Sequence, residues 1–170
     1  MHAWLNEPGV VRWWEGSDVS MDAVVADYGS QRTDLEVEHW IASVDDKPFG
    51  WICCWPVTED LEEAGPWFPL GVAQTAAGID YLVGDTDRRG QGLGSAMIRA
   101  FVFNVVFGRH CEWTQVAASP YEGNVGSWKA LEKAGFTFAG MVQYPDDDEG
   151  PCHLMMMDRP DNGWRVTAGR

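Results

Sequence analysis

The stretch "RRGQGLGSAMIRAFV", residues 88–102, places three glycines in five positions directly before a helical pattern. From Leu93 onward, apolar residues recur at helical spacing, ending in "MIRAFV". Glycines at such a junction allow unusual backbone angles and expose successive N–H groups at a helix N-terminus, where anions are favoured. The stretch therefore predicts a turn that holds a phosphate-bearing ligand against the start of a helix.

Two better-known phosphate loops do not fit this turn. No Gly-Lys-Ser/Thr follows the glycines, which excludes a Walker loop. The spacing RGQGLG and its late place in the chain also disagree with a dinucleotide-binding Gly-x-Gly-x-x-Gly. Arg88 and Arg89 add positive charge at the turn, although the chain as a whole is acidic.

The composition excludes several classes of partner. The 170 residues carry a net charge of −14, which repels nucleic-acid backbones and anionic lipid surfaces. No apolar run approaches the roughly 20 residues that span a bilayer, and no signal peptide opens the chain. The four cysteines show neither a metal-binding spacing nor a disulfide framework, so we expect buried thiols and no metal. We expect one domain, residues 1–170, in a cytoplasmic protein that is a monomer or a homodimer.

Strand and helix patterns alternate along the chain. A helix is expected after Ser20, which suits the N-cap position. Residues 59–77 read as a long irregular loop, and loops of that length in a compact domain tend to be functional. Strands are expected at 38–44, 49–57, 78–85, 113–119, 136–143 and 152–158, and helices from 93 onward and at 127–135. This order predicts an α/β (α+β mixed) fold, with a mixed sheet and helices on both faces.

Three motifs together resemble the GNAT acyl-CoA N-acyltransferases. "RRGQGLG" is similar to that family's Arg/Gln-x-x-Gly-x-Gly/Ala pyrophosphate loop, and "NVGSWKALEKAGF" (124–136) to the segment that closes its cofactor site. "KPFGW" (47–51) matches the strand and turn before them. The resemblance covers most of residues 37–157. It implies a twisted, mostly antiparallel central sheet flanked by helices, with splayed strands that hold acetyl-CoA. The cofactor-binding residues that it implies are Leu82, Val83, Arg89, Gly90, Gln91, Gly92, Leu93, Gly94, Ser95 and Asn124.

Within the superfamily, two groups share features with this chain. "AWLNEPGVVRWWEG" (3–16) and the Gly-Ile-Asp of "AGIDYLVGD" (77–85) resemble the aminoglycoside 6'-N-acetyltransferases. Enzymes that acylate hydroxylamines of siderophore precursors typically have His in place of that aspartate, yet "YLVGD" and "LEKAGF" read more like them. The aspartate, Asp80, favours an aminoglycoside acceptor. The hydroxylamine enzymes and a non-catalytic acyl-CoA-binding module remain as alternatives.

The sequence also departs from the family in three places. The family tyrosine credited with protonating the leaving thiol is replaced by Leu131, and a second acid of the aminoglycoside group falls at Ser119. The usual first strand is missing before the first helix. We expect either a trimmed start or an edge covered by "GWRVTAGR" (163–170) or by a partner chain.

Acetyl transfer to an amine requires a neutral nitrogen. For an ordinary alkylammonium, deprotonation at pH 7 costs about 4 to 5 kcal/mol. A carboxylate that binds the ammonium and takes its proton solves this problem, and Asp80 is the candidate. The leaving thiol is cheaper to release unprotonated, so the loss at Leu131 is tolerable, and Tyr121, Ser119 or water are open as proton donors. A backbone N–H near Leu82 or Val83 is expected to polarise the thioester carbonyl.

A polycationic amino sugar needs several carboxylates and flat apolar surfaces. The family resemblance brings several such residues of this chain to the acceptor side. We expect contacts with the acceptor from Trp13, Trp14, Glu62, Glu63, Trp67, Asp80, Asp146 and Asp147.

Overall fold

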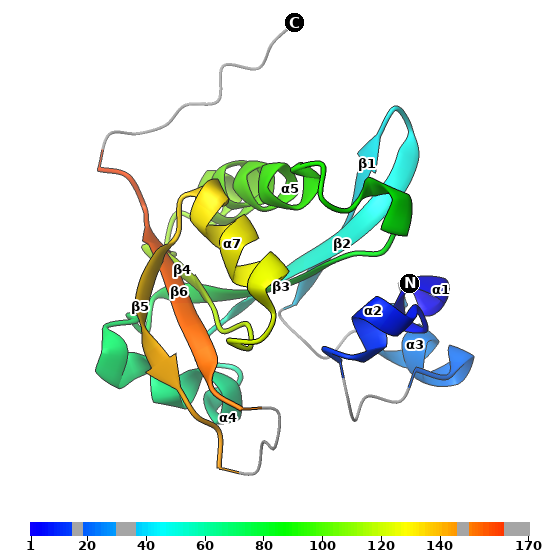
Figure 1. The fold of residues 1–170 in the computed structure, drawn as a ribbon. Coiled ribbons are helices and arrows are strands. Elements are labelled where there is room, and N and C mark those ends of the chain that lie inside the picture. The colour runs from blue at the N-terminus through cyan, green and yellow to red at the C-terminus, as the bar shows by residue number, and fades with distance from the viewer. Residues whose placement is uncertain (15–18, 30–36, 146–149, 162–170) are drawn as a thin grey trace, which may run out of the picture.

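The fold is built around one six-stranded sheet, seen in a computed structural model that describes residues 1–14, 19–29, 37–145 and 150–161 (Figure 1). The strand order is β1-β2-β3-β4-β6-β5, and neighbours run antiparallel except for β3 and β4. The strands are β1 (Glu38–Val44), β2 (Lys47–Pro56), β3 (Ala76–Val83), β4 (Gln115–Ala118), β5 (Thr137–Val142) and β6 (Cys152–Asp158). The mixed, mostly antiparallel sheet predicted from the sequence is confirmed.

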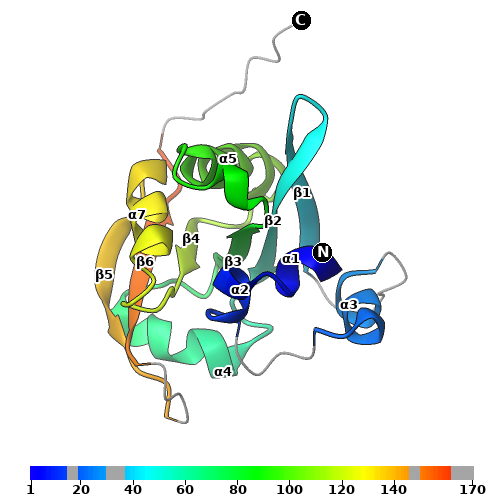
Figure 2. The same ribbon diagram turned by 45° about the vertical axis from the view of Figure 1, so that its right-hand side comes forward.

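The helices lie in groups around this sheet. Figure 2 shows α5 and α7 beside each other on one side of the sheet, with α1, α2 and α4 away from them. Ser20 caps α3 as predicted, because its hydroxyl accepts a hydrogen bond from the Ala23 amide at 3.3 Å. The helices are α1 (His2–Leu5), α2 (Pro8–Val11), α3 (Met21–Tyr28), α4 (Leu61–Ala64), α5 (Leu93–Phe101), α6 (Phe107–Arg109) and α7 (Val125–Ala134). A π-helical stretch, Val102–Val106, joins α5 to α6.

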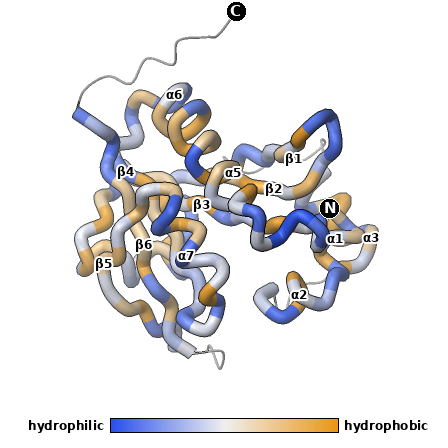
Figure 3. The backbone as a smooth tube through the Cα atoms, turned by 45° about the horizontal axis from the view of Figure 1, so that its top comes forward, coloured by the Kyte–Doolittle hydropathy of each residue, from blue (hydrophilic) through white to orange (hydrophobic). Residues whose placement is uncertain are grey.

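A tight turn joins β1 and β2 in a hairpin. Asp45 and Asp46 both have positive φ, 51° and 60°, which is the geometry that joins two antiparallel strands in a two-residue turn. This turn is hydrophilic in Figure 3, in keeping with its exposure. The long β2 then runs into the centre of the sheet and positions β3.

β3 and β4 separate after a short contact. They pair only over Ala76–Gly78 and Gln115–Ala117, while β3 continues to Val83. Beyond Gly78, β3 keeps its antiparallel partner β2 through to Val83 with no break in register. The parallel strands therefore diverge in the middle of the sheet and leave one edge of β3 open, which confirms the splayed strands that the family resemblance implies.

Two hydrophobic clusters cover the two faces of the sheet. One contains Ile79 with the buried residues of α5 and α7, such as Ile98 and Leu131. The other contains Leu82 with Trp55 and the residues around α4. Successive residues of a strand point to opposite faces, so β3 contributes to both clusters in alternation.

One expectation changes in the structure, and another concerns residues outside its described part. Residues 59–77 are not an irregular loop throughout, because α4 and a 3₁₀ helix, Gly65–Leu70, occupy much of that segment. The carboxylate of Asp60 caps α4 by accepting from the Glu63 amide at 3.0 Å, a local signal that the sequence reading overlooked. β1 is an edge strand of the described sheet, and the residues suggested to cover it, 163–170, lie outside the described residues. None of the described helices has the length and apolar character needed to cross a membrane.

Candidate active site

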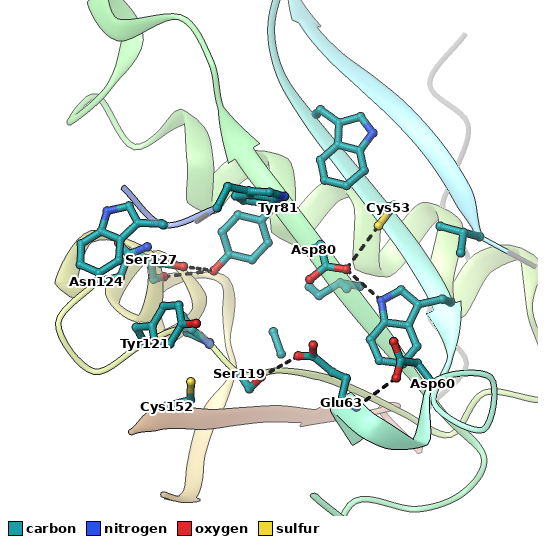
Figure 4. Close-up of a pocket in the computed structure, with 18 of the residues that line it drawn as sticks. Cys53, Asp60, Glu63, Asp80, Tyr81, Ser119, Tyr121, Asn124, Ser127 and Cys152 are labelled. Atoms are coloured by element: carbon teal, nitrogen blue, oxygen red, sulfur yellow. Dashed lines mark hydrogen bonds between the residues drawn. The ribbon is translucent and has the colours of Figure 1, made fainter. Parts of the chain in front are cut away.

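A cavity of about 830 Å³ opens where β3 and β4 separate (Figure 4). Its wall is made by the N-terminal helices, by β2 and β3, by α4 and by the segment between β4 and α7. Acidic side chains and aromatic rings dominate the lining, which includes Trp13, Trp14, Tyr28, Trp51, Trp55, Glu59, Asp60, Glu62, Glu63, Asp80, Tyr81, Tyr121 and Tyr144. A cavity with this lining suits a cation that also presents flat apolar faces.

Asp80 lies on β3 at the centre of this wall. Its Oδ2 accepts a hydrogen bond from Nε1 of Trp55 at 2.9 Å and a longer one from the Cys53 thiol at 3.7 Å. Burial raises the pKa of Asp80, and the Trp55 hydrogen bond only partly opposes this. A cation beside an aspartate held in this way stabilises the ionised carboxylate, because the positive charge offsets the cost of desolvation.

Glu63, on α4, provides a second carboxylate on the same cavity. Figure 4 shows the carboxylates of Asp80 and Glu63 directed into one space, with Ser119 bonded to Glu63. Burial, and then the negative charge of Asp80, raise the pKa of Glu63 to about 7. Two carboxylates that share a site do not ionise independently, so Glu63 keeps its proton up to near neutral pH.

The position of Glu63 bears on one difference from the family pattern, the serine at position 119. The family resemblance places an acid where this chain has Ser119, and the Ser119 hydroxyl donates instead to Oε1 of Glu63 at 2.9 Å. A carboxylate from α4 therefore lies within hydrogen-bond distance of the side chain at position 119, which directly follows β4. The two residues are 56 positions apart, so spacing along the sequence could not reveal this contact.

A small network of hydrogen bonds holds the backbone of Glu63 in place. The Tyr144 hydroxyl donates to the backbone carbonyl of Glu63 at 3.1 Å and lies 3.1 Å from the Ser119 hydroxyl. Nε1 of Trp67 donates to that same Tyr144 hydroxyl at 2.9 Å. Trp67 is 1% exposed and packs against Trp55, so it lies behind the cavity wall rather than on its surface.

The other predicted acceptor contacts fall into two groups. Trp13, Trp14 and Glu62 line the cavity; Trp13 stacks on Tyr121 with ring centroids 6.3 Å apart, and Trp14 meets Trp51 edge-on. Asp146 and Asp147 lie outside the described residues. The structure thus brings both N-terminal tryptophans and two acids of α4 to the same cavity as Asp80.

The glycine turn has the backbone geometry that the sequence indicates. Gly90 and Gly92 have positive φ, 73° and 81°, and Gly92 is the N-cap of α5. A Cβ at either position would meet nothing within 4 Å, so the space above the turn is open to a ligand. Leu93, Gly94 and Ser95 form the first turn of α5, and the Gln91 side chain donates to the Asp87 carbonyl at 2.6 Å. An exposed helix N-terminus reached through two glycines fits the pyrophosphate of CoA.

Arg89 is held away from that space in this structure. Its Nη2 lies 2.6 Å from a carboxylate oxygen of Glu7, and its Nε donates to the Val83 carbonyl at 2.9 Å. The guanidinium therefore ties the N-terminal helices to the end of β3. Leu82, the residue before Val83 in β3, is buried in the hydrophobic cluster on the acidic side of the sheet.

The start of α7 forms the remaining wall of the cavity. Asn124 caps this helix by accepting from the Ser127 amide at 3.3 Å. Leu131, one turn after Ser127, is fully buried among core residues and offers no polar atom. The sequence reading missed Tyr81, whose hydroxyl lies 2.7 Å from the Ser127 hydroxyl and which also lines the cavity.

Comparison with known proteins agrees with this geometry. The acetyltransferase (GNAT) domain family matches residues 1–144. The chain belongs to the GNAT acetyltransferases. An aminoglycoside N(6')-acetyltransferase type 1 of Klebsiella pneumoniae is 28% identical over 164 residues, which cover 94% of this chain and 77% of that protein. A kanamycin resistance protein of Rhizobium radiobacter is 32% identical over 99 residues, or 58% of this chain and 87% of its own length.

A solved structure extends the comparison to the fold. Aminoglycoside acetyltransferase AAC(6')-Ib in complex with coenzyme A and kanamycin superposes with a TM-score of 0.75 at 27% identity, covering 93% of this chain and 87% of the other. The GNAT fold and acetyl-CoA-dependent acetyl transfer follow from membership of this family. The acceptor has to be argued from the cavity.

Proposed function

We propose that this GNAT acetyltransferase transfers the acetyl group of acetyl-CoA to a primary amine of a small polycation, an aminoglycoside acetylated at its 6'-amine. The observation that carries the proposal is the pair of carboxylates, Asp80 and Glu63, on one tryptophan-lined cavity at the opening of the sheet. A protonated amine is the ligand that such a pair favours, because it compensates two desolvated negative charges at once. The similarity to aminoglycoside acetyltransferases supports the same class of acceptor.

The two carboxylates divide the work with the amine. Asp80 is held by Trp55 and Cys53, so it is the fixed partner that orients the ammonium. Asp80 accepts the proton of the ammonium, and Glu63, whose pKa is raised to about 7, is the group able to take that proton from it near neutral pH and pass it to solvent. Acetyl-CoA supplies the activated acyl group. The neutral nitrogen then attacks the thioester carbonyl carbon directly.

The glycine turn is proposed as the site of the CoA pyrophosphate. Gly90 to Ser95 would bind the phosphates through backbone N–H groups and the N-terminus of α5. Asn124, which lines the cavity at the start of α7, would contact the pantetheine arm. Leu82 and Val83 are proposed to offer a backbone N–H to the carbonyl oxygen at the open edge of β3.

An acceptor series tests the proposal. Thiol release from acetyl-CoA is measured with an aminoglycoside that carries a 6'-amine, with the matched compound that has a 6'-hydroxyl instead, and with a hydroxylamine of the siderophore-precursor type. Of the three acceptors, we expect turnover only of the aminoglycoside with the 6'-amine. We also expect the KM for that acceptor to rise with salt concentration, since several charge pairs act on one ligand. Faster turnover of the hydroxylamine, or a KM that does not respond to salt, would contradict the proposal.

A further inference from the structure

The two neighbours Asp80 and Tyr81 line the same cavity although they point to opposite faces of the sheet. Asp80 lies on the side of Trp55 and α4, and Tyr81 packs against the cluster formed with α5 and α7. One cavity reaches both side chains only because β4 has left β3 by this point, after Gly78. The cavity therefore passes through the sheet, from an acidic face to a face that carries hydroxyl groups.

The far side of this passage is where a leaving sulfur has to lie. An amine held by Asp80 approaches the thioester carbonyl from the acidic face. The glycine turn and the N-terminus of α5 lie on the other face, so CoA bound there brings its sulfur up from the side of α5 and α7. The C–S bond then breaks on the side of Tyr81.

Two hydroxyl groups lie on that side, near the amide side chain of Asn124 at the start of α7. The Tyr81 hydroxyl lies 2.7 Å from the Ser127 hydroxyl and donates to the Ser127 carbonyl at 3.3 Å (Figure 4). Ser127 is four residues before Leu131 and so lies on the same side of α7, one turn closer to its N-terminus. The Ser119 hydroxyl, considered above as a donor, is already committed to Glu63.

We propose that the Tyr81 hydroxyl donates to the Ser127 hydroxyl, and that the Ser127 hydroxyl in turn donates a hydrogen bond to the sulfur of CoA as it leaves. The inference rests on acetyl transfer by this site and not on the identity of the acceptor. In the step, the nitrogen lone pair forms the C–N bond and the electrons of the C–S bond pass to sulfur. The proton from nitrogen goes to the carboxylate pair, and the hydrogen-bonded thiolate takes up a proton from solvent when it departs.

The surroundings of Tyr81 suit a donor that keeps its proton. Burial raises the pKa of the Tyr81 phenol, with the Ser127 hydrogen bond opposing this in part. The phenol therefore stays protonated throughout the working pH range and, through the Ser127 hydroxyl, stabilises negative charge on sulfur without losing its own proton.

The binding of CoA gives a test that does not depend on turnover. Affinities for CoA and for desulfo-CoA, which lacks the sulfur, are measured by calorimetry at pH 6 and pH 9.5 for wild type, Tyr81→Phe and Ser127→Ala. A hydrogen bond to a charged group corresponds to a factor of roughly 10 to 100 in affinity. We expect both variants to lose CoA affinity by about that factor at pH 9.5, where the thiol is ionised, and to bind desulfo-CoA like wild type.

The kinetic arm uses the same variants with any amine that the enzyme accepts, or with water as the acceptor. Turnover should fall by a similar factor while KM for acetyl-CoA is unchanged. Thr114→Val is the matched control, because it removes one member of another hydroxyl pair, Thr75 and Thr114, which is also 2.7 Å apart but does not line the cavity. That control should change neither quantity.

Two results would overturn the inference. One is a folded Tyr81→Phe protein with wild-type turnover and wild-type CoA affinity at pH 9.5. The other is an equal loss of CoA and desulfo-CoA affinity, which would make the pair a structural contact. Ser127→Ala decides the question if Tyr81→Phe does not fold. Failure of the aminoglycoside proposal leaves all these measurements intact, since none of them requires that acceptor.

Discussion

The two faces of β3 serve opposite charges. On one face, Asp80 and Glu63 are desolvated carboxylates among tryptophans, an arrangement that attracts a cation. On the other, the start of α5 offers backbone N–H groups and Tyr81 and Ser127 offer hydroxyls, an arrangement without negative charge that suits phosphate and thiolate. The difference shows how one strand can bring a cationic acceptor and an anionic donor together, because the sheet itself keeps their binding surfaces apart.

The largest predicted effect is the loss of activity in Asp80→Asn, on the acidic face of β3. The amide keeps the shape but has neither charge nor basicity, and a positioned base typically contributes about 10²- to 10⁴-fold. We expect kcat/KM for a 6'-amine to fall by that order, with the residual rate rising with pH as free amine becomes available. Calorimetric affinity for CoA should stay at the wild-type value. A folded variant with full activity would remove Asp80 from the mechanism.

On the opposite face, Gly92→Val is predicted to weaken the binding of CoA. A valine at a φ of 81° is strained by about 1 to 2 kcal/mol, and its side chain would fill the open space above the turn. We expect CoA affinity to fall roughly tenfold or more. Gly126→Ala is the control, since Gly126 lies in α7 and a Cβ there also meets nothing within 4 Å. Unchanged CoA affinity in folded Gly92→Val would remove the turn from the cofactor site.

Glu63→Gln sharpens the comparison by separating the two acids. With a pKa of about 7, Glu63 is mostly protonated at pH 6 and mostly charged at pH 8, a change of about tenfold in the ionised fraction. The ratio of wild-type to variant kcat/KM should therefore rise by about tenfold between these pH values. A ratio independent of pH would assign the proton transfer to Asp80 alone.

The smallest expected effect is on the stability of the ligand-free protein. Because the folded state raises the pKa of Glu63 from 4.5 to about 7, it binds more protons than the unfolded chain between those values. The free energy of unfolding should decrease as pH rises through this window, and Glu63→Gln should reduce the decrease. Thermal melting at pH 5 and pH 8 measures this as a difference of about 5 to 10 °C. An identical pH dependence in the variant would show that Glu63 is not desolvated.

The sequence predicted the parts of the site that depend on local chemistry. Gly90 and Gly92 indicate an unusual backbone before a helix, since glycine acts directly on the chain next to it. The pattern of residues 152–158 predicted strand β6 with the same bounds.

Contacts across the sheet could not be predicted in that way. Glu63 reaches Ser119, and Tyr81 reaches Ser127, over 56 and 46 positions along the chain. Both depend on how far β4 diverges from β3, which no local pattern encodes. Leu131, which stands where the family has a tyrosine, was nevertheless a signal to look for another hydroxyl nearby. A hydroxyl lost from one turn of a helix can be supplied from the turn before it.

The unbroken register of β2 and β3 has a consequence for how this chain can vary. Seven consecutive pairs, from Gly50 with Val83 to Pro56 with Ala77, are in step, and Asp80 and Tyr81 occupy alternate faces within them. Deleting or inserting a single residue in either strand would reverse the alternation beyond that point, placing the acid among the hydroxyls and the phenol among the tryptophans. Substitutions can adjust each face separately, but natural length variation should be confined to the loops, and any relative with an insertion here must carry a compensating bulge.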